Sequence, residues 1–155
     1  MNRIIIWLLL LLTLLVLSVI GYSEEWFSLK STLILPFKSV VSAGFGGLLY
    51  LLRAVYVNKC VKKSWDEEWE IWYYIRPFTS LLSGVASYIF LKAGVLVLNA
   101  EIEVSTSSYG FMAVAFIAGL NVDKFTSKLE DLAKAAWGVE KSRMNSKKDD
   151  NETTT

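Results

Sequence analysis

Apolar residues in this chain are gathered into four stretches separated by polar segments. The stretches are residues 4–20, 39–57, 78–98 and a shorter one that ends at Leu120. A helix needs about 20 apolar residues to cross a hydrocarbon core of roughly 30 Å, and three of the stretches approach that length. The pattern predicts an all-α fold, an integral membrane four-helix bundle.

The fourth stretch is the shortest. Residues 109–120 alone cannot cross, and a full span needs residues 104–122, with Ser105, Thr106, Ser107 and Ser108 in the outer leaflet. Hydroxyl groups can donate to the preceding helical turn, which lowers the cost of burying them in lipid. The alternative is a hairpin-like excursion shielded by the other helices. The basic residues that follow favour full crossing.

Hydrophobic residues make up 54% of the chain and the mean hydropathy is +0.41, although the loops and the C-terminus are strongly polar. The apolar residues must therefore be concentrated in the four stretches. This composition supports the membrane assignment.

Basic residues predict the orientation. With the N-terminus inside and four crossings, most of the sixteen Lys and Arg fall on one side: Arg3, Arg53, Lys59, Lys62, Lys63, Arg76 and every basic residue from Lys124 to Lys148. Lys30 alone falls on the opposite side. Because Lys and Arg in short loops resist translocation, the basic side is cytoplasmic. We expect a multi-pass protein of the cell membrane with both termini cytoplasmic.

The first stretch has a second interpretation. Its basic start, its Ile/Leu run and the small residues near Gly21 resemble a secretory signal peptide, cleaved after Gly21. The run is longer than a usual signal core, which favours an uncleaved helix.

Small residues recur every four positions in three of the stretches. These predicted helix-packing residues are Ser39, Ala43 and Gly47 in the second, Ser80 and Gly84 in the third, and Ala115 and Gly119 in the fourth. In lipid, close backbone approach and van der Waals fit supply much of the association energy. We expect a tight bundle, within one chain or between chains.

Residues 64–75 predict a short amphipathic helix on the cytoplasmic surface. Ser64 is a good N-cap, three acidic residues occupy the first turn, and Trp65, Trp69 and Trp72 share one face. Tryptophans favour the headgroup region, so membrane anchoring is the expected role. A partner-binding aromatic face is the alternative. The third span is expected to open at Arg76.

Two lysines lie at the margins of apolar stretches. Pro36 predicts that the second helix starts just after Lys38, which leaves this lysine at headgroup level. Lys92 is an intramembrane charge near the outer boundary, where it can extend outward to water. The functional alternative is that Lys92 faces an anion path and pairs with Glu101 or Glu103.

A cytoplasmic amphipathic helix is expected at residues 121–138, after the last span. Its apolar stripe, the predicted association surface, consists of Val122, Phe125, Leu129, Leu132, Ala136 and Val139. The spacing suits either a short coiled-coil seam or a helix lying on the membrane. We group residues 1–138 as one membrane domain and expect residues 139–155 to form a disordered polar tail.

Several short motifs between residues 72 and 138 resemble a module of uncharacterised small prokaryotic multi-pass membrane proteins. They are Arg76-Pro77, then Tyr88, Lys92, Ala93 and Gly94, then Tyr109-Gly110 and Ala115-Phe116-Ile117-Ala118-Gly119. The family often has a serine and a charged pair after the last glycine, where this chain has residues 121–124. The resemblance implies a membrane protein of prokaryotic type and no activity.

Residues for common catalytic chemistry are absent from the sequence. The chain has no histidine and one cysteine, Cys60, so zinc sites, histidine acid–base catalysis and an intramolecular disulfide are excluded. We predict no catalytic, cofactor or metal residues and no cofactor. Cys60 is either palmitoylated or a free thiol. The clustered lysines favour anionic lipid at the cytoplasmic face over nucleic acid.

Two functions fit these expectations. The first is a non-enzymatic scaffold or accessory subunit that acts through helix–helix association, as a homo-oligomer or in a larger membrane complex. The alternative is an oligomeric ion channel or membrane-permeabilising protein, with Lys92 and the serines of the third span lining the path. A membrane enzyme ranks third.

Overall fold

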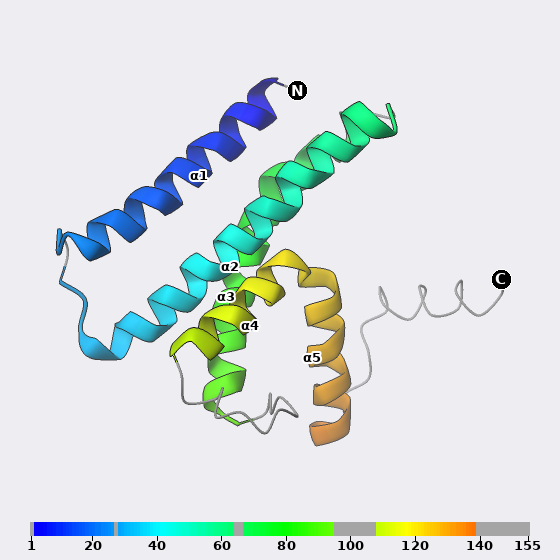
Figure 1. The fold of residues 1–155 in the computed structure, drawn as a ribbon. Helices are drawn as coiled ribbons and strands as arrows, with labels where there is room; N and C mark the ends of the chain where they lie inside the picture. Colours follow the sequence, from blue (N-terminus) through cyan, green and yellow to red (C-terminus); the bar gives the residue numbers. More distant parts are fainter. Residues whose placement is uncertain (1, 27, 64–66, 95–107, 139–155) are drawn as a thin grey trace. The chain divides into compact units, whose positions relative to one another are not determined.

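The computed structural model describes residues 2–26, 28–63, 67–94 and 108–138, and within these ranges every regular element is helical (Figure 1). The predicted all-α class is confirmed. The elements are α1 (Asn2–Ser23), α2 (Ser31–Tyr56), the π-helix η1 (Val57–Val61), the 3₁₀ turn η2 (Glu67–Trp69), α3 (Glu70–Lys92), α4 (Ser108–Leu120) and α5 (Val122–Trp137).

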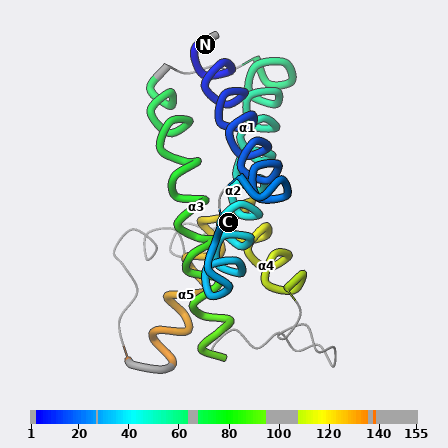
Figure 2. Tube along the Cα trace, turned by 90° about the vertical axis from the view of Figure 1, so that its left-hand side faces the viewer, coloured from blue at the N-terminus to red at the C-terminus, as the bar shows by residue number. Residues whose placement is uncertain are grey.

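The chain divides into two compact units, Met1–Val122 and Asp123–Thr155. In the first unit α1 and α2 run antiparallel, and α3 returns along α2 (Figures 1 and 2). Helix α4 packs against both α2 and α3. Helix α2 is therefore the centre of the first unit, since it contacts each of the other three helices.

Two helices are long and apolar enough to cross a membrane, Arg3–Ser23 and Ser31–Val61, the second being α2 with its π-helical extension. Ser108–Leu120 is apolar but shorter. Helix α3 is less apolar than these helices, because it contains Arg76 and several serines. The expected continuation of the third span to Leu98 lies outside the described residues.

Two helix boundaries expected from prolines are wrong. Helix α2 begins at Ser31, so Pro36 lies inside it, and α3 begins at Glu70, so Pro77 lies inside that helix. Each proline removes one backbone hydrogen bond, and here each lies near the start of a long helix whose remaining bonds hold it. Residues 70–75 thus belong to α3 and form no separate surface helix. Residues 64–66 lie outside the description.

Helix α1 packs most deeply through its N-terminal half. Ile4 and Leu8 are fully buried. They belong to one apolar cluster: Ile4, Leu8, Leu48, Leu51, Val55 and Tyr73. The opposite face of α1 is bare, with Leu10 51% and Leu14 57% exposed. Helix α1 is therefore an integral part of the first unit, and it turns a continuous apolar surface outward.

Helix α5 begins the second unit and is amphipathic in sequence. It ends at Trp137, and Gly138 follows with a φ of +67° that suits glycine and an N–H that donates to the Lys134 carbonyl at 2.9 Å. These bounds agree closely with the expected helix at residues 121–138. The polar tail from residue 139 lies outside the described residues.

Candidate functional site

The small residues singled out in the sequence meet where α2, α3 and α4 pack together. Ser39, Ala43, Ser80 and Ala115 are each 0% exposed. The glycines Gly47, Gly84 and Gly119 are buried beside them. We call these seven residues the small-residue contact. It brings together three helices from one chain.

Backbone touches backbone at this contact. A methyl group on Gly119 would overlap the backbone carbonyl of Ala43, and one on Gly46 would overlap the carbonyl of Phe116. A methyl group on Gly84 would lie 2.7 Å from Cβ of Ala43. Real Cβ atoms do not approach other heavy atoms so closely. The helix spacing therefore requires glycine at these positions.

Hydroxyl groups join the same helices. Ser80 Oγ donates to the Gly119 carbonyl at 3.1 Å and is also within 3.0 Å of the Arg76 carbonyl one turn earlier. Ser42 Oγ donates to the Met112 carbonyl at 2.7 Å. Carbonyls in the last turn of a helix lack partners in that helix, and Ser80 serves one of those of α4.

The other serines of α3 turn their hydroxyls onto their own helix. Ser83 donates to the Ser80 carbonyl at 2.7 Å, and Ser87 donates to the Gly84 carbonyl at 2.9 Å. Both side chains are buried, at 6% and 0% exposure. Within the described part of this chain, these serines line no water-filled path.

Helix α4 is short, and it ends part-way along α2. Its 13 residues span about 20 Å. The Gly119–Leu120 end lies beside Gly46 and Gly47. Gly47 precedes Arg53 by six residues, so α4 stops about 9 Å short of the level of Arg53 along the axis of α2.

Lysines mark the opposite end of the first unit. Lys92 Nζ is exposed and lies 3.1 Å from the Tyr88 hydroxyl. It is 5.5 Å from the centre of that ring, beyond its hydroxyl edge, so the contact is a hydrogen bond rather than a cation–π contact. Lys38 Nζ lies 5.7 Å from the Tyr22 ring. The suggested partners of Lys92, Glu101 and Glu103, lie outside the described residues.

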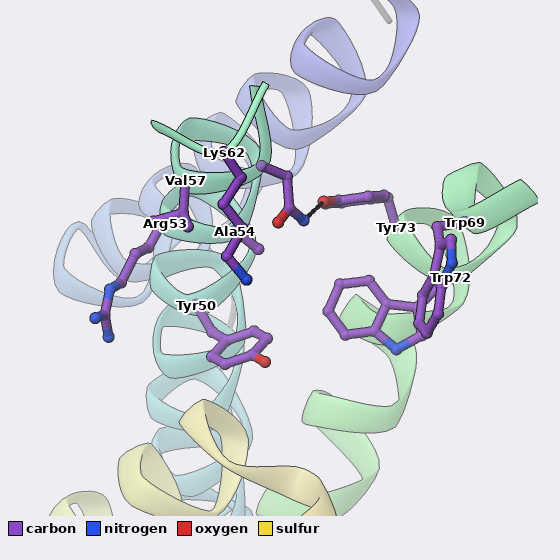
Figure 3. Close-up of a pocket in the computed structure, with 9 residues that line it drawn as sticks. Tyr50, Arg53, Ala54, Val57, Lys62, Trp69, Trp72 and Tyr73 are labelled. Atoms are coloured by element: carbon purple, nitrogen blue, oxygen red, sulfur yellow. Dashed lines mark hydrogen bonds between the residues drawn. The ribbon is translucent and has the colours of Figure 1, made fainter. Parts of the chain in front are cut away.

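A pocket of about 370 Å³ opens between the end of α2, η1 and the start of α3 (Figure 3). We call it the aromatic–cation pocket. Its lining residues are Tyr50, Arg53, Ala54, Val57, Asn58, Lys62, Trp69, Trp72 and Tyr73. It combines aromatic rings, an amide and two cations, and no described carboxylate lines it.

Two of the rings that line the pocket also pack against a buried arginine. Arg76 is 4% exposed, and its guanidinium carbon lies 5.3 Å from the Tyr50 ring and 5.4 Å from the Trp72 ring. Trp72 also meets the Tyr73 ring edge-on at 5.2 Å. A desolvated cation over an aromatic face gains about 2 kcal/mol or more, so these rings help to hold Arg76 in place.

The mouth of the pocket is polar. Asn58 Nδ2 donates to the Tyr73 hydroxyl at 3.1 Å, which links η1 to α3. In Figure 3 the Lys62 side chain extends along α2 toward Tyr50, whereas Arg53 points away from the two tryptophans. Within the described residues neither Lys62 nor Arg53 forms an ion pair. The sequence had suggested Trp69 and Trp72 as surface anchors and missed the contacts of Trp72 with Tyr50 and Arg76.

A second cavity, of about 570 Å³, lies toward the other end of the first unit and is lined mainly by apolar atoms of α1, α2 and α4. Val19, Val41, Phe45, Met112 and Phe116 form much of its wall. This cavity has few polar groups that could bind or orient a polar ligand.

The predicted association stripe is carried by α5. Val122, Phe125, Leu129 and Leu132 lie on this helix. Residue 136 is also part of α5, although its side chain is not among those described. Val139 lies outside the described residues. Among the residues that the structure describes, no three His, Cys, Asp or Glu side chains gather as a metal site, and Cys60 is exposed.

Comparison with known proteins gives no relative: no protein-family model, curated protein or solved structure matches the chain.

Proposed function

We propose that this chain is a small multi-pass membrane protein with both termini in the cytoplasm, and that it acts as a non-enzymatic scaffold or accessory subunit. The two helices with the length and composition of a span support the membrane location. The bare apolar face of α1 also suits lipid, because it would be costly in water.

The cation levels along α2 and α3 support a crossing by each of these two helices. Lys38 and Arg53 are fifteen residues apart on α2, about 23 Å, and Arg76 and Lys92 are sixteen apart on α3, about 24 Å. Such pairs flank a hydrocarbon slab thinner than average. Arg53 and Lys92 are exposed and can extend to the headgroups, whereas the buried Arg76 stays among the rings. The inner level is that of Arg53 and Arg76.

Helix α4 would supply the last crossing although it is short. Its end lies about 9 Å below the level of Arg53, and Lys124 and Lys128 follow at once. A helix shorter than the hydrocarbon core is accommodated by local thinning of the bilayer and by basic residues that flank it. The remaining basic residues of the tail resist translocation, which favours a cytoplasmic C-terminus over a return to the outer face.

One observation carries the scaffold proposal: the small-residue faces are already buried in contacts between helices of the same chain. Ser39, Ala43 and Ser80 have no exposed surface, so they cannot also bind a second bundle. Association must then use another surface. The amphipathic helix α5 belongs to a separate unit, and its heptad-like stripe suits a second copy of itself.

The scaffold proposal is tested by the oligomeric state of the full chain in nanodiscs or mild detergent. We expect an oligomer for the wild type and a monomer for Leu132→Glu, which places a charge in the stripe. Ala135→Glu, on the exposed side of α5, should leave the oligomer intact. A wild-type monomer, or equal effects of both changes, would refute association through α5.

The channel alternative is tested by conductance. The serines of α3 are buried and bonded to carbonyls, so we expect liposomes that contain the purified protein to stay ion-tight. Lys92→Leu should not alter that tightness. An anion leak in the wild type that Lys92→Leu changes would favour the channel instead.

A further inference from the structure

We propose that the aromatic–cation pocket binds the phosphate of an anionic phospholipid headgroup. The pocket lies where α2 passes into η1 and α3 begins, and its volume of about 370 Å³ is that of a small ligand site. The proposed scaffold function does not assign a ligand to this pocket. The proposal rests on the membrane arrangement proposed above, which puts this end of the helices at the cytoplasmic interface.

The positive charge of the pocket favours an anionic ligand. Lys62 and Arg53 line the pocket, and within the described residues neither is neutralised by a carboxylate. The lysine side chain extends along the pocket wall toward Tyr50 (Figure 3). An ammonium group supplies three N–H donors to phosphate oxygens. Arg53, directed outward, adds to the positive potential at the rim.

Neutral groups complete the site. The Asn58 amide is held by its bond to the Tyr73 hydroxyl at 3.1 Å and retains a second N–H. Trp69 stands at the mouth with 61% of its surface exposed, and Trp72 forms the wall. Indole rings favour the depth of lipid glycerol and headgroups, so they would flank a lipid phosphate.

A lipid fits this setting better than a soluble phosphate compound. The same basic and aromatic chemistry would accept either source of phosphate. However, the pocket is framed by rings that prefer the membrane interface, and basic pockets between membrane helices on the cytoplasmic side recognise anionic headgroups. The lipid is also present at high local concentration there.

The test is native mass spectrometry of the full chain in neutral detergent, titrated with phosphatidylglycerol, phosphatidylcholine or inorganic phosphate. We expect one saturable phosphatidylglycerol site per chain, with at least fivefold weaker binding of phosphatidylcholine. Lys62→Gln should weaken phosphatidylglycerol binding about fivefold, the usual contribution of one lysine near an anionic surface. Trp69→Ala should weaken it as well.

Lys63→Gln is the matched control, because it removes the same charge from the neighbouring residue, which does not line the pocket. It should change the affinity less than twofold. Lys62, Lys63 and Trp69 are exposed, so all three variants should fold normally. Equal binding of the two lipids, or equal effects of Lys62→Gln and Lys63→Gln, would overturn the site.

Inorganic phosphate that displaces the lipid and binds as tightly would overturn the lipid source and assign the pocket to a soluble anion. Carbonate extraction of membranes separates this result from a failure of the membrane proposal. A protein that stays in the membrane pellet but binds no anionic lipid refutes the pocket alone. A protein released by carbonate refutes the membrane arrangement itself.

Discussion

The hydroxyl of Ser80 on α3 donates to the backbone carbonyl of Gly119 at the end of α4, over 3.1 Å. The bond is possible because Gly119 has no side chain and lies directly against Ala43 of α2. One hydroxyl and one glycine thus hold three helices at a single point. Substitutions there should therefore weaken the packing of α4 against α2 and α3.

Ser80→Ala should lower the free energy of unfolding by about 0.6 kcal/mol, the average for an interhelical hydrogen bond in a membrane protein. Denaturation with sodium dodecyl sulfate in mixed micelles measures this quantity. Ser83→Ala is the control, since that hydroxyl donates only within α3. If both changes cost the same, Ser80 has no special role in joining α4.

Ala115→Val should destabilise the bundle by about 1–3 kcal/mol, because Ala115 is fully buried and two added methyl groups overpack the contact. Ala113→Val adds the same groups on the exposed side of α4 and should be nearly neutral. Thermal unfolding in detergent compares the pair. A neutral Ala115→Val would contradict tight packing of α4.

Leu8→Ala should cost about 1–3 kcal/mol, since it leaves a cavity beside Leu51 and Val55, although the transfer term is small in lipid. Leu10→Ala, on the bare face of α1, should cost much less. The same unfolding assay compares them. If residues 1–21 were removed as a signal peptide, neither change would alter the mature protein, and its intact mass would fall below 17.5 kDa.

The sequence predicted the presence of the helices better than the residues at which they begin. Hydrophobic periodicity and small-residue spacing are local signals, and they located α1, α2, α4 and α5. The ends of α2 and α3 were misjudged because Pro36 and Pro77 were taken as helix starts. A proline costs one backbone bond, and the neighbouring turns of a long helix can outweigh that cost.

The aromatic–cation pocket could not be predicted from the sequence. Tyr50 and Trp72 are far apart along the chain, and only the antiparallel packing of α2 and α3 brings them together beside Arg76. The tryptophan spacing did mark one wall of the pocket. Which ring faces which cation depends on the register between two helices, and that register is set by the glycines of the small-residue contact.

The membrane arrangement itself is tested most directly by the accessibility of Cys60, the one cysteine of the chain, which is exposed in η1 just after α2. Intact cells are treated with a membrane-impermeant maleimide, and carbonate-washed membranes are then assayed for labelled protein. The account predicts that the protein stays in the pellet and that Cys60 is labelled only after the membrane is permeabilised. Labelling in intact cells, or recovery of the protein in the aqueous fraction, would contradict it.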